Sequence, residues 1–193
     1  MAKKNDMKNN TTYKLVLSGI MVALAVLLSF VQVYSLPMGG SITLFSMVPI
    51  VAVSWLLGTG WGLGSGFALA LLQMIFGFSN FGYVSGPLAY FVLTMADYIL
   101  PFTLLGLGGI FRNKIKNDYV AIGVGAFMVG VIRFICHFIS GITIWGAWAS
   151  DDTMSAICAY SLTYNGSYML PETILTVIGS LLLLKLVFPK VEK

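Results

Sequence analysis

Long apolar segments separated by short polar ones constrain the fold of this chain more than any other feature. Six such segments lie at residues 14–33, 43–57, 61–78, 87–111, 120–144 and 159–188. A membrane-spanning helix needs about 20 mostly apolar residues, and several of the segments reach that length. Only 9% of the residues are charged, whereas soluble domains carry about 25%. The sequence therefore predicts an all-α integral membrane protein, a bundle of six transmembrane helices.

The positions of the basic residues predict how the bundle is oriented, because cytoplasmic loops of membrane proteins carry an excess of Lys and Arg. The basic residues outside the apolar segments, or at their ends, are Lys3, Lys4, Lys8, Lys14, Arg112, Lys114, Lys116, Lys185, Lys190 and Lys193. The segments at 34–42, 79–86 and 145–158 contain no Lys or Arg. We therefore expect cytoplasmic tails at 1–13 and 189–193, flanking a single transmembrane domain at 14–188.

Ionisable side chains also occur inside the apolar segments. They are Asp97, Arg133, His137 and Glu172. A charge facing lipid at the bilayer centre costs about 2.5 kcal/mol or more, so these side chains are expected to face the interior of the bundle. From the rise of a helix, Asp97, His137 and Asn165 are predicted to reach a similar depth. Arg133 and Glu172 lie deeper, and we expect them to form an ion pair, because a lone buried charge is unfavourable.

Helical spacing aligns further polar and aromatic residues with these groups. The aligned residues are Tyr90, Thr94 and Asp97 in the fourth segment, Arg133, His137, Gly141 and Trp145 in and just after the fifth, and Tyr160, Asn165, Tyr168 and Glu172 in the sixth. Carboxylates attract cations and aromatic faces stabilise them, while imidazole and amide groups form hydrogen bonds with ring nitrogens. The pattern predicts an aromatic-walled pocket, open to the outside, for a small, flat, cationic molecule.

Other classes of function find less support in the sequence. The chain has no G-x-x-x-x-G-K-[ST] loop, so it is not expected to hydrolyse ATP. Cys136 and Cys158 lack the spacing of metal ligands, and neither a metal nor a cofactor is expected. A small membrane enzyme that uses His137 and Asp97 as an acid–base pair is a remote alternative, because no nucleophile or metal set accompanies them. We expect a protein that is not an enzyme.

Three motifs resemble one known family. The motifs are "LTMADYILPFTLLGLGGIFR" (93–112), "RFICHFISGITIW" (133–145) and "YSLTYNGSYMLPE" (160–172). Together they are similar to the ThiT/YuaJ family, the thiamine-specific substrate-binding subunits of energy-coupling factor (ECF) transporters, which are bacterial ABC importers. The resemblance extends from about Lys14 to Phe188. It implies a six-helix protein of the bacterial cell membrane that binds thiamine near its outer side. It also implies partners, namely a transmembrane coupling protein and two cytoplasmic ATPases.

The resemblance also assigns roles to individual residues. The matching ligand-binding positions are Asp97, Tyr98, His137, Gly141, Trp145, Tyr160 and Asn165, and Glu172 is expected near the thiazolium ring. Gly19 and Ala23 match the small residues on which the coupling protein docks. Some family members have a tryptophan in the first external loop and an additional tyrosine near the site. Here the candidates for such a lid or wall are Tyr34, Tyr83 and Tyr90.

The sequence is compatible with two kinds of ligand. A different small heterocyclic vitamin or precursor, bound by another substrate-binding subunit of the same transporter class, is the main alternative to thiamine. For thiamine, two acids near the pocket, Asp97 and Glu172, would repel a phosphate group. The sequence therefore predicts a preference for free thiamine over its phosphate esters.

Overall fold

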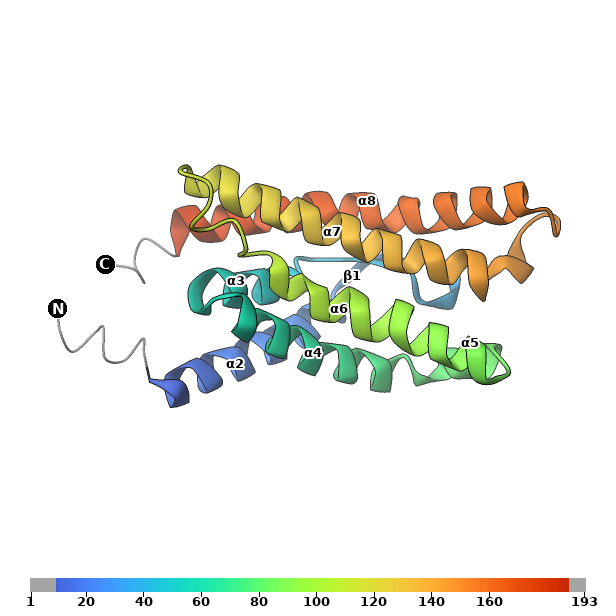
Figure 1. Cartoon of the computed structure of the whole chain (residues 1–193), viewed down its shortest axis with the longest axis horizontal. Coiled ribbons are helices and arrows are strands. Elements are labelled where there is room, and N and C mark those ends of the chain that lie inside the picture. Colours follow the sequence, from blue (N-terminus) through green and yellow to red (C-terminus); the bar gives the residue numbers. More distant parts are fainter. Residues whose placement is uncertain (1–9, 188–193) are drawn as a thin grey trace.

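The computed structural model describes residues 10–187, and most of them are helical. The helices are α2 (Thr11–Ser29), α3 (Val48–Leu57), α4 (Thr59–Phe76), α5 (Pro87–Val92), the π-helical segment η3 (Leu93–Ile99), α6 (Leu100–Thr103), the 3-10 segment η4 (Leu104–Leu107), α7 (Asp118–Thr143) and α8 (Met154–Leu186). They run lengthwise in an elongated bundle in which α7 and α8 lie side by side (Figure 1). The helix α2 begins and α8 ends at the same end of this bundle (Figure 1).

Within the described residues, five helical segments are long and apolar enough to cross a membrane: Thr11–Ser29, Thr59–Phe76, Pro87–Leu107, Asp118–Thr143 and Met154–Leu186. The protein is therefore a mostly helical, multi-pass membrane protein, as predicted. The remaining predicted segment, 43–57, is helical only from Val48. Its helix, α3, has 10 residues and is too short to cross a membrane by itself. The tails at 1–9 and 188–193, with Lys3, Lys4, Lys8, Lys190 and Lys193, lie outside the described residues.

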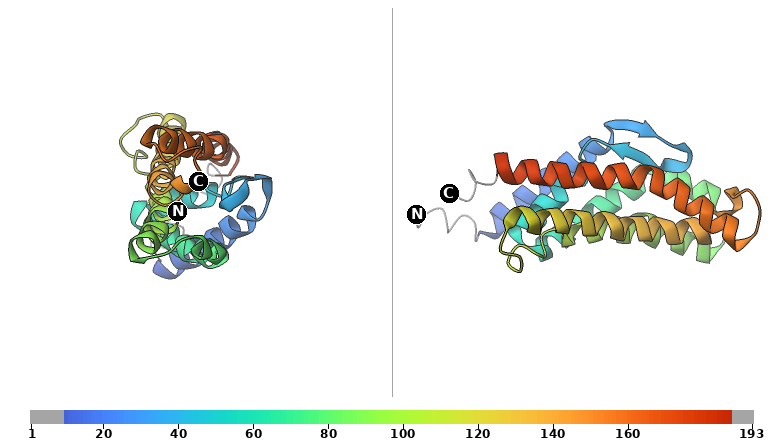
Figure 2. Two further views of the ribbon diagram at one scale, coloured as in Figure 1. Left: turned by 90° about the vertical axis from the view of Figure 1, so that its right-hand side faces the viewer. Right: turned by 90° about the horizontal axis from the view of Figure 1, so that it is seen from above.

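The ends of two predicted helices, residues 30–33 and 43–47, are not helical, and a β-hairpin lies between α2 and α3. Its antiparallel strands are β1 (Gln32–Ser35) and β2 (Ser41–Thr43), joined through the 3-10 turn η1 (Pro37–Gly39). Proline 37 cannot donate a backbone hydrogen bond, and Gly39 has a φ of 96°, in the left-handed region that glycine adopts readily. These two residues form the turn of the hairpin, well after the end of α2 at Ser29. Figure 2 shows the hairpin at the side of the bundle, next to α8.

The helix α8 supplies hydrogen-bond partners for backbone groups of the hairpin. The N–H of Thr43 donates to Glu172 Oε2 at 2.7 Å, and the N–H of Gly40 donates to Tyr164 Oη at 3.2 Å. Non-helical backbone at membrane depth is stable only where its polar groups are satisfied within the protein. The polar residues of α8 thus satisfy backbone groups of a hairpin that lies at the side of the bundle.

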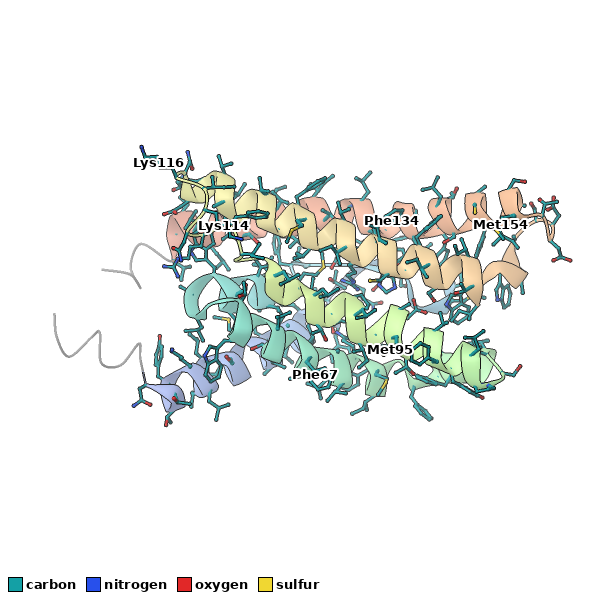
Figure 3. The ribbon with its side chains drawn as sticks, in the orientation of Figure 1. Phe67, Met95, Lys114, Lys116, Phe134 and Met154 are labelled. Carbon is teal, nitrogen blue, oxygen red and sulfur yellow. The ribbon has the colours of Figure 1, made fainter. Side chains whose placement is uncertain are left out.

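Close contacts at glycines join α3 and α4 to the fourth apolar segment. Lys114 and Lys116 lie at one end of the bundle and Met154 lies at the other (Figure 3). The helical conformation is interrupted between α3 and α4 at Gly58, which has a φ of 96°, a value that favours glycine. The Ser54 hydroxyl then links α3 to the fourth segment, donating to the Gly106 carbonyl at 2.5 Å and accepting from the Gly109 N–H at 2.9 Å. A Cβ on Gly106 would overlap the backbone of α4 at Gly62. The backbones of α4 and the fourth segment therefore lie too close together at Gly62 and Gly106 for a side chain at either position.

Candidate functional site: a polar cavity between η3, α7 and α8

A cavity of about 490 Å³ lies between α4, η3, α7, α8 and the hairpin. Its volume falls in the range of roughly 300–1,000 Å³ typical of small-molecule sites. Of the residues that the sequence analysis aligned with or assigned to the site, those that line the cavity are Tyr83, Asp97, Tyr98, Arg133, His137, Gly141, Trp145, Tyr160, Asn165 and Tyr168. The structure therefore brings the acid, the imidazole and the amide of the three motifs to one cavity. Tyr34, Tyr90 and Glu172 are not among the lining residues.

The Asp97 carboxylate is the centre of the hydrogen-bond network in this cavity. Its Oδ1 lies 3.0 Å from His137 Nδ1. Its Oδ2 accepts hydrogen bonds from Ser140 Oγ at 2.6 Å and from Trp145 Nε1 at 3.0 Å. Hydrogen bonds to a carboxylate are stronger than bonds between neutral groups. Three donors from α7 and its C-terminal end thus hold one charge in a fixed orientation.

The π-helical segment η3 presents Asp97 to the cavity, and the sequence contains a local cause for it. Proline 101 has no N–H to donate to the carbonyl of Asp97, four residues earlier, so the regular α-helical bond cannot form there. The backbone widens instead, and the N–H of Leu100 bonds to the carbonyl of Met95, five residues back. Such π-helical turns are often found at functional sites. Here the turn presents the Asp97 carboxylate to donors on α7 and just after it.

The imidazole of His137 is held between Asp97 and Arg133. Arg133 Nε lies 3.3 Å from His137 Nε2. Because a guanidinium can only donate, Nε2 must accept, and the ring proton is assigned to Nδ1, which donates to Asp97. His137 is therefore neutral in this arrangement. The direction of the two bonds fixes its tautomer.

The prediction of an ion pair between Arg133 and Glu172 is wrong. Glu172 is 2% exposed and accepts from the Thr43 N–H, from Thr43 Oγ1 at 2.5 Å and from Ser46 Oγ at 3.2 Å. Arg133 instead contacts His137 and lies over the ring of Phe102, 4.5 Å from its centroid. Thr43, in the hairpin that was not predicted, donates hydrogen bonds to the Glu172 carboxylate. The buried carboxylate is therefore stabilised without a cation beside it.

Asn165 joins α8 to α7 through hydrogen bonds to the chain. Its Nδ2 donates to the His137 carbonyl at 3.2 Å and to the Ser161 carbonyl at 3.0 Å, and its Oδ1 accepts from Tyr168 Oη at 2.9 Å. The amide is 4% exposed. Although Asn165 lines the cavity, most of its hydrogen-bonding capacity is used within the protein. In this structure it holds the backbone of His137 against α8.

Gly141 allows α7 and α8 to approach each other beside the site. A Cβ at this position would overlap Ser161 Oγ and would lie 2.8 Å from Ser161 Cβ and 3.1 Å from Asn165 Nδ2. The neighbouring residue Ser140 is 0% exposed. A side chain on Gly141 would thus separate the two helices that hold His137 and Asn165.

We expect Gly141→Ala to lower the thermal unfolding midpoint of the purified protein. Overpacking of a filled core costs about 1–3 kcal/mol, more than the roughly 1 kcal/mol that alanine gains over glycine in a helix. The matched control is Gly123→Ala, also on α7, where the nearest atom would lie 3.8 Å from the new Cβ. An equal midpoint for both variants would contradict the close approach at Gly141.

Aromatic rings form the walls of the cavity. Tyr160 and Tyr164 of α8 stack with centroids 5.8 Å apart, and Tyr164 meets Tyr168 edge to face at 5.8 Å. The ring centroids of two further lining residues, Tyr83 and Trp145, lie 6.4 Å apart. Tyr90 stacks on Phe81 outside the lining, and Tyr34 is 58% exposed on β1. Of the three candidates for a lid or wall, only Tyr83 therefore reaches the cavity.

Sequence reasoning missed several residues of the site. Ser140 donates to Asp97, and its position three residues after His137 was the available signal. Asn80 donates to Tyr98 Oη at 3.0 Å, while Tyr98 donates to the Gly77 carbonyl at 2.8 Å. These contacts join the segment after α4 to η3. No sequence pattern indicated them. Within residues 10–187, no cluster of three or more His, Cys, Asp or Glu residues is arranged to hold a metal ion.

Comparison with known proteins identifies the family. The sequence profile of the family described as "Thiamine transporter protein (Thia_YuaJ)" matches residues 15–192, nearly the whole chain. The chain belongs to the Thia_YuaJ family. The thiamine transporter ThiT of Bacillus subtilis (strain 168) is 32% identical over 176 residues, which cover 86% of each chain. ThiT of Lacticaseibacillus paracasei is 27% identical over 143 residues, covering 69% of this chain and 68% of the relative.

A solved structure shares the fold. ThiT from Listeria monocytogenes superposes with a TM-score of 0.75 over 95% of this chain and 98% of that one, at 24% identity. The resemblance to the Thia_YuaJ family drawn from the three motifs is thus confirmed. As a member, the chain is a multi-pass bacterial membrane protein of a transporter family, not an enzyme.

Proposed function

We propose that this chain is the high-affinity thiamine-binding subunit of an ECF-type ABC importer. It captures thiamine from outside the cell and delivers it through a partner ATPase module. The observation that carries the proposal is the cluster of Asp97, His137 and Trp145 in the wall of the cavity. Membership of a family of thiamine transporters supports thiamine as the ligand.

The chemistry of the cavity fits the two rings of thiamine. The aminopyrimidine pairs with Asp97, whose carboxylate can accept a further hydrogen bond, and with His137 once a ring nitrogen exchanges its present partner, Asp97 or Arg133, for the ligand. The cationic thiazolium stacks on Trp145 and Tyr160, because aromatic faces attract cations. The Asp97 carboxylate offsets its charge. Glu172, which was expected near this ring, is occupied by Thr43 and Ser46, so we now propose that it acts by holding the hairpin.

The proposed orientation has six passages with both termini in the cytoplasm. The hairpin together with α3 forms the second passage, so five long helices and one composite segment cross the bilayer. Lys14, Arg112, Lys114, Lys116 and Lys185 then face the cytoplasm, as the distribution of basic residues predicts. The cavity lies in the outer half.

The proposed partners are a transmembrane coupling protein and two cytoplasmic ATPases. The sequence lacks a phosphate-binding loop of its own, so uphill transport needs an energy source elsewhere. On α2, Gly19 and Ala23 are exposed, and a Cβ on Gly19 would meet nothing within 4 Å. Small exposed residues allow close helix contact in membranes. This face of α2 is the proposed docking site for the coupling protein.

Intrinsic tryptophan fluorescence tests the ligand assignment. Thiamine added to the purified protein is expected to quench the emission of Trp145, with a dissociation constant from nanomolar to low micromolar. Unlabelled pyrimidines and other heterocyclic vitamins serve as competitors. Displacement of thiamine by one of them at a lower concentration than by thiamine itself would contradict the assignment and favour the alternative ligand.

A further inference from the structure

Ser140 lies beside the cavity rather than in its wall. Its side chain is 0% exposed, and it is not among the residues that line the cavity. Its hydroxyl donates to Asp97 Oδ2 at 2.6 Å, the shortest of the three hydrogen bonds that the Asp97 carboxylate accepts. A ligand in the cavity does not meet Ser140, so the hydroxyl acts on binding through Asp97.

The backbone carbonyl of Ser140 also places a second donor on the same carboxylate. It accepts from the N–H of Ile144 at 2.9 Å and from the N–H of Trp145 at 3.4 Å, where α7 ends. The indole Nε1 of Trp145 then donates to Asp97 Oδ2 at 3.0 Å. Replacing Ser140 by alanine keeps this backbone carbonyl and removes only the hydroxyl, so the effect of the hydroxyl can be measured separately.

The number of donors leaves one defined acceptor site on Asp97. A carboxylate has about four lone-pair sites, two on each oxygen. Ser140 and Trp145 occupy both sites on Oδ2, and His137 occupies one on Oδ1. The remaining site is on Oδ1. An ionised carboxylate accepts hydrogen bonds and cannot donate them, so a ligand must offer an N–H or O–H there.

We propose that Ser140 is a positioning residue that makes the site specific for an amino group on the pyrimidine ring of the ligand. This inference rests on the proposed function and names the edge of the ring that is recognised. Thiamine offers its 4-amino group to the free site on Asp97. In the 4-oxo analogue of thiamine a carbonyl takes that place, and the N–H lies on the neighbouring ring nitrogen. A carboxylate held by Ser140 cannot turn to follow that donor.

Competition binding on the full-length protein tests this role. Dissociation constants for thiamine and its 4-oxo analogue are measured for the wild type, Ser140→Ala and Ser140→Cys. The wild type should bind thiamine at least about a hundredfold more tightly, because a site built for a donor rejects an analogue that lacks it. In Ser140→Ala thiamine should bind about tenfold more weakly, and the analogue should change less than about twofold, so the ratio falls at least about fivefold. Ser140→Cys, which keeps a weak donor, should fall between them.

The matched control is Ser180→Ala on α8. Ser180 is 1% exposed, its hydroxyl has no hydrogen-bond partner within residues 10–187, and it does not line the cavity. Both affinities should therefore equal those of the wild type.

The ratio of the two affinities separates positioning from support of the fold. Equal weakening of both ligands in Ser140→Ala would mean that the hydroxyl only stabilises the bundle, and an unchanged ratio would likewise overturn the proposal. If Ser140→Ala does not fold, an unchanged ratio in Ser140→Cys overturns it. A wild type that binds both ligands equally would overturn the specificity with the proposed function intact. Failure of the wild type to bind thiamine would reject the proposed function itself.

Discussion

Asp97→Asn is expected to weaken thiamine binding by about tenfold to a hundredfold, since a hydrogen bond to a charged group contributes about 1.5–3 kcal/mol. The carboxylate accepts from His137 on one oxygen and from Ser140 and Trp145 on the other. An asparagine amide must turn its NH₂ toward one of these sets of donors. It also removes the negative charge that offsets the thiazolium.

The matched control for this variant is Asp152→Asn, which removes a carboxylate from an exposed position in the loop before α8. Its affinity for thiamine should equal that of the wild type. Isothermal titration calorimetry of both variants and the wild type measures the difference. An Asp97→Asn protein that keeps its fold and binds thiamine with wild-type affinity would remove Asp97 from the site.

Glu172→Leu is expected to destabilise the protein, lowering its thermal unfolding midpoint in detergent by several degrees. The leucine leaves the backbone N–H of Thr43 without its acceptor at 2.7 Å, and it also removes the acceptor for Thr43 Oγ1 and Ser46 Oγ. A buried donor left unsatisfied costs about 1–3 kcal/mol. Because Thr43 belongs to β2, the hairpin should loosen at its attachment to α8.

Glu172→Gln separates hydrogen bonding from charge. Its amide oxygen can still accept from the Thr43 N–H, while its NH₂ can donate to the Thr43 hydroxyl, which rotates to accept. We therefore expect a smaller loss of stability than for Glu172→Leu. Equal losses in the two variants would show that the negative charge, rather than the pairing of the hairpin, is what stabilises this region.

The apolar segments and the three motifs allowed much of the fold to be predicted. Long runs such as 120–144 correspond to α7 (Asp118–Thr143), because bilayer thickness and the rise of a helix set the length of a spanning helix. The hairpin could not be predicted in this way. Its backbone is paired by Glu172 and Tyr164, which are more than 120 residues away in the sequence.

The site was predictable where spacing along a helix determines it. His137, Gly141 and Trp145 follow one another at four-residue intervals, and all line the cavity. The partner of Arg133 was not predictable, because the pairing depends on which donors reach Glu172 across the bundle. The π-helical turn at Asp97 was also missed, although Pro101 four residues later was its local cause.

The most direct test of the account is an experimental structure of the protein with thiamine bound. The aminopyrimidine is expected within hydrogen-bond distance, about 2.7–3.2 Å, of Asp97 and His137, with the thiazolium against Trp145. Thiamine bound elsewhere on the protein, or Asp97 and His137 turned away from it toward the lipid, would contradict the assignment of this cavity as the thiamine site.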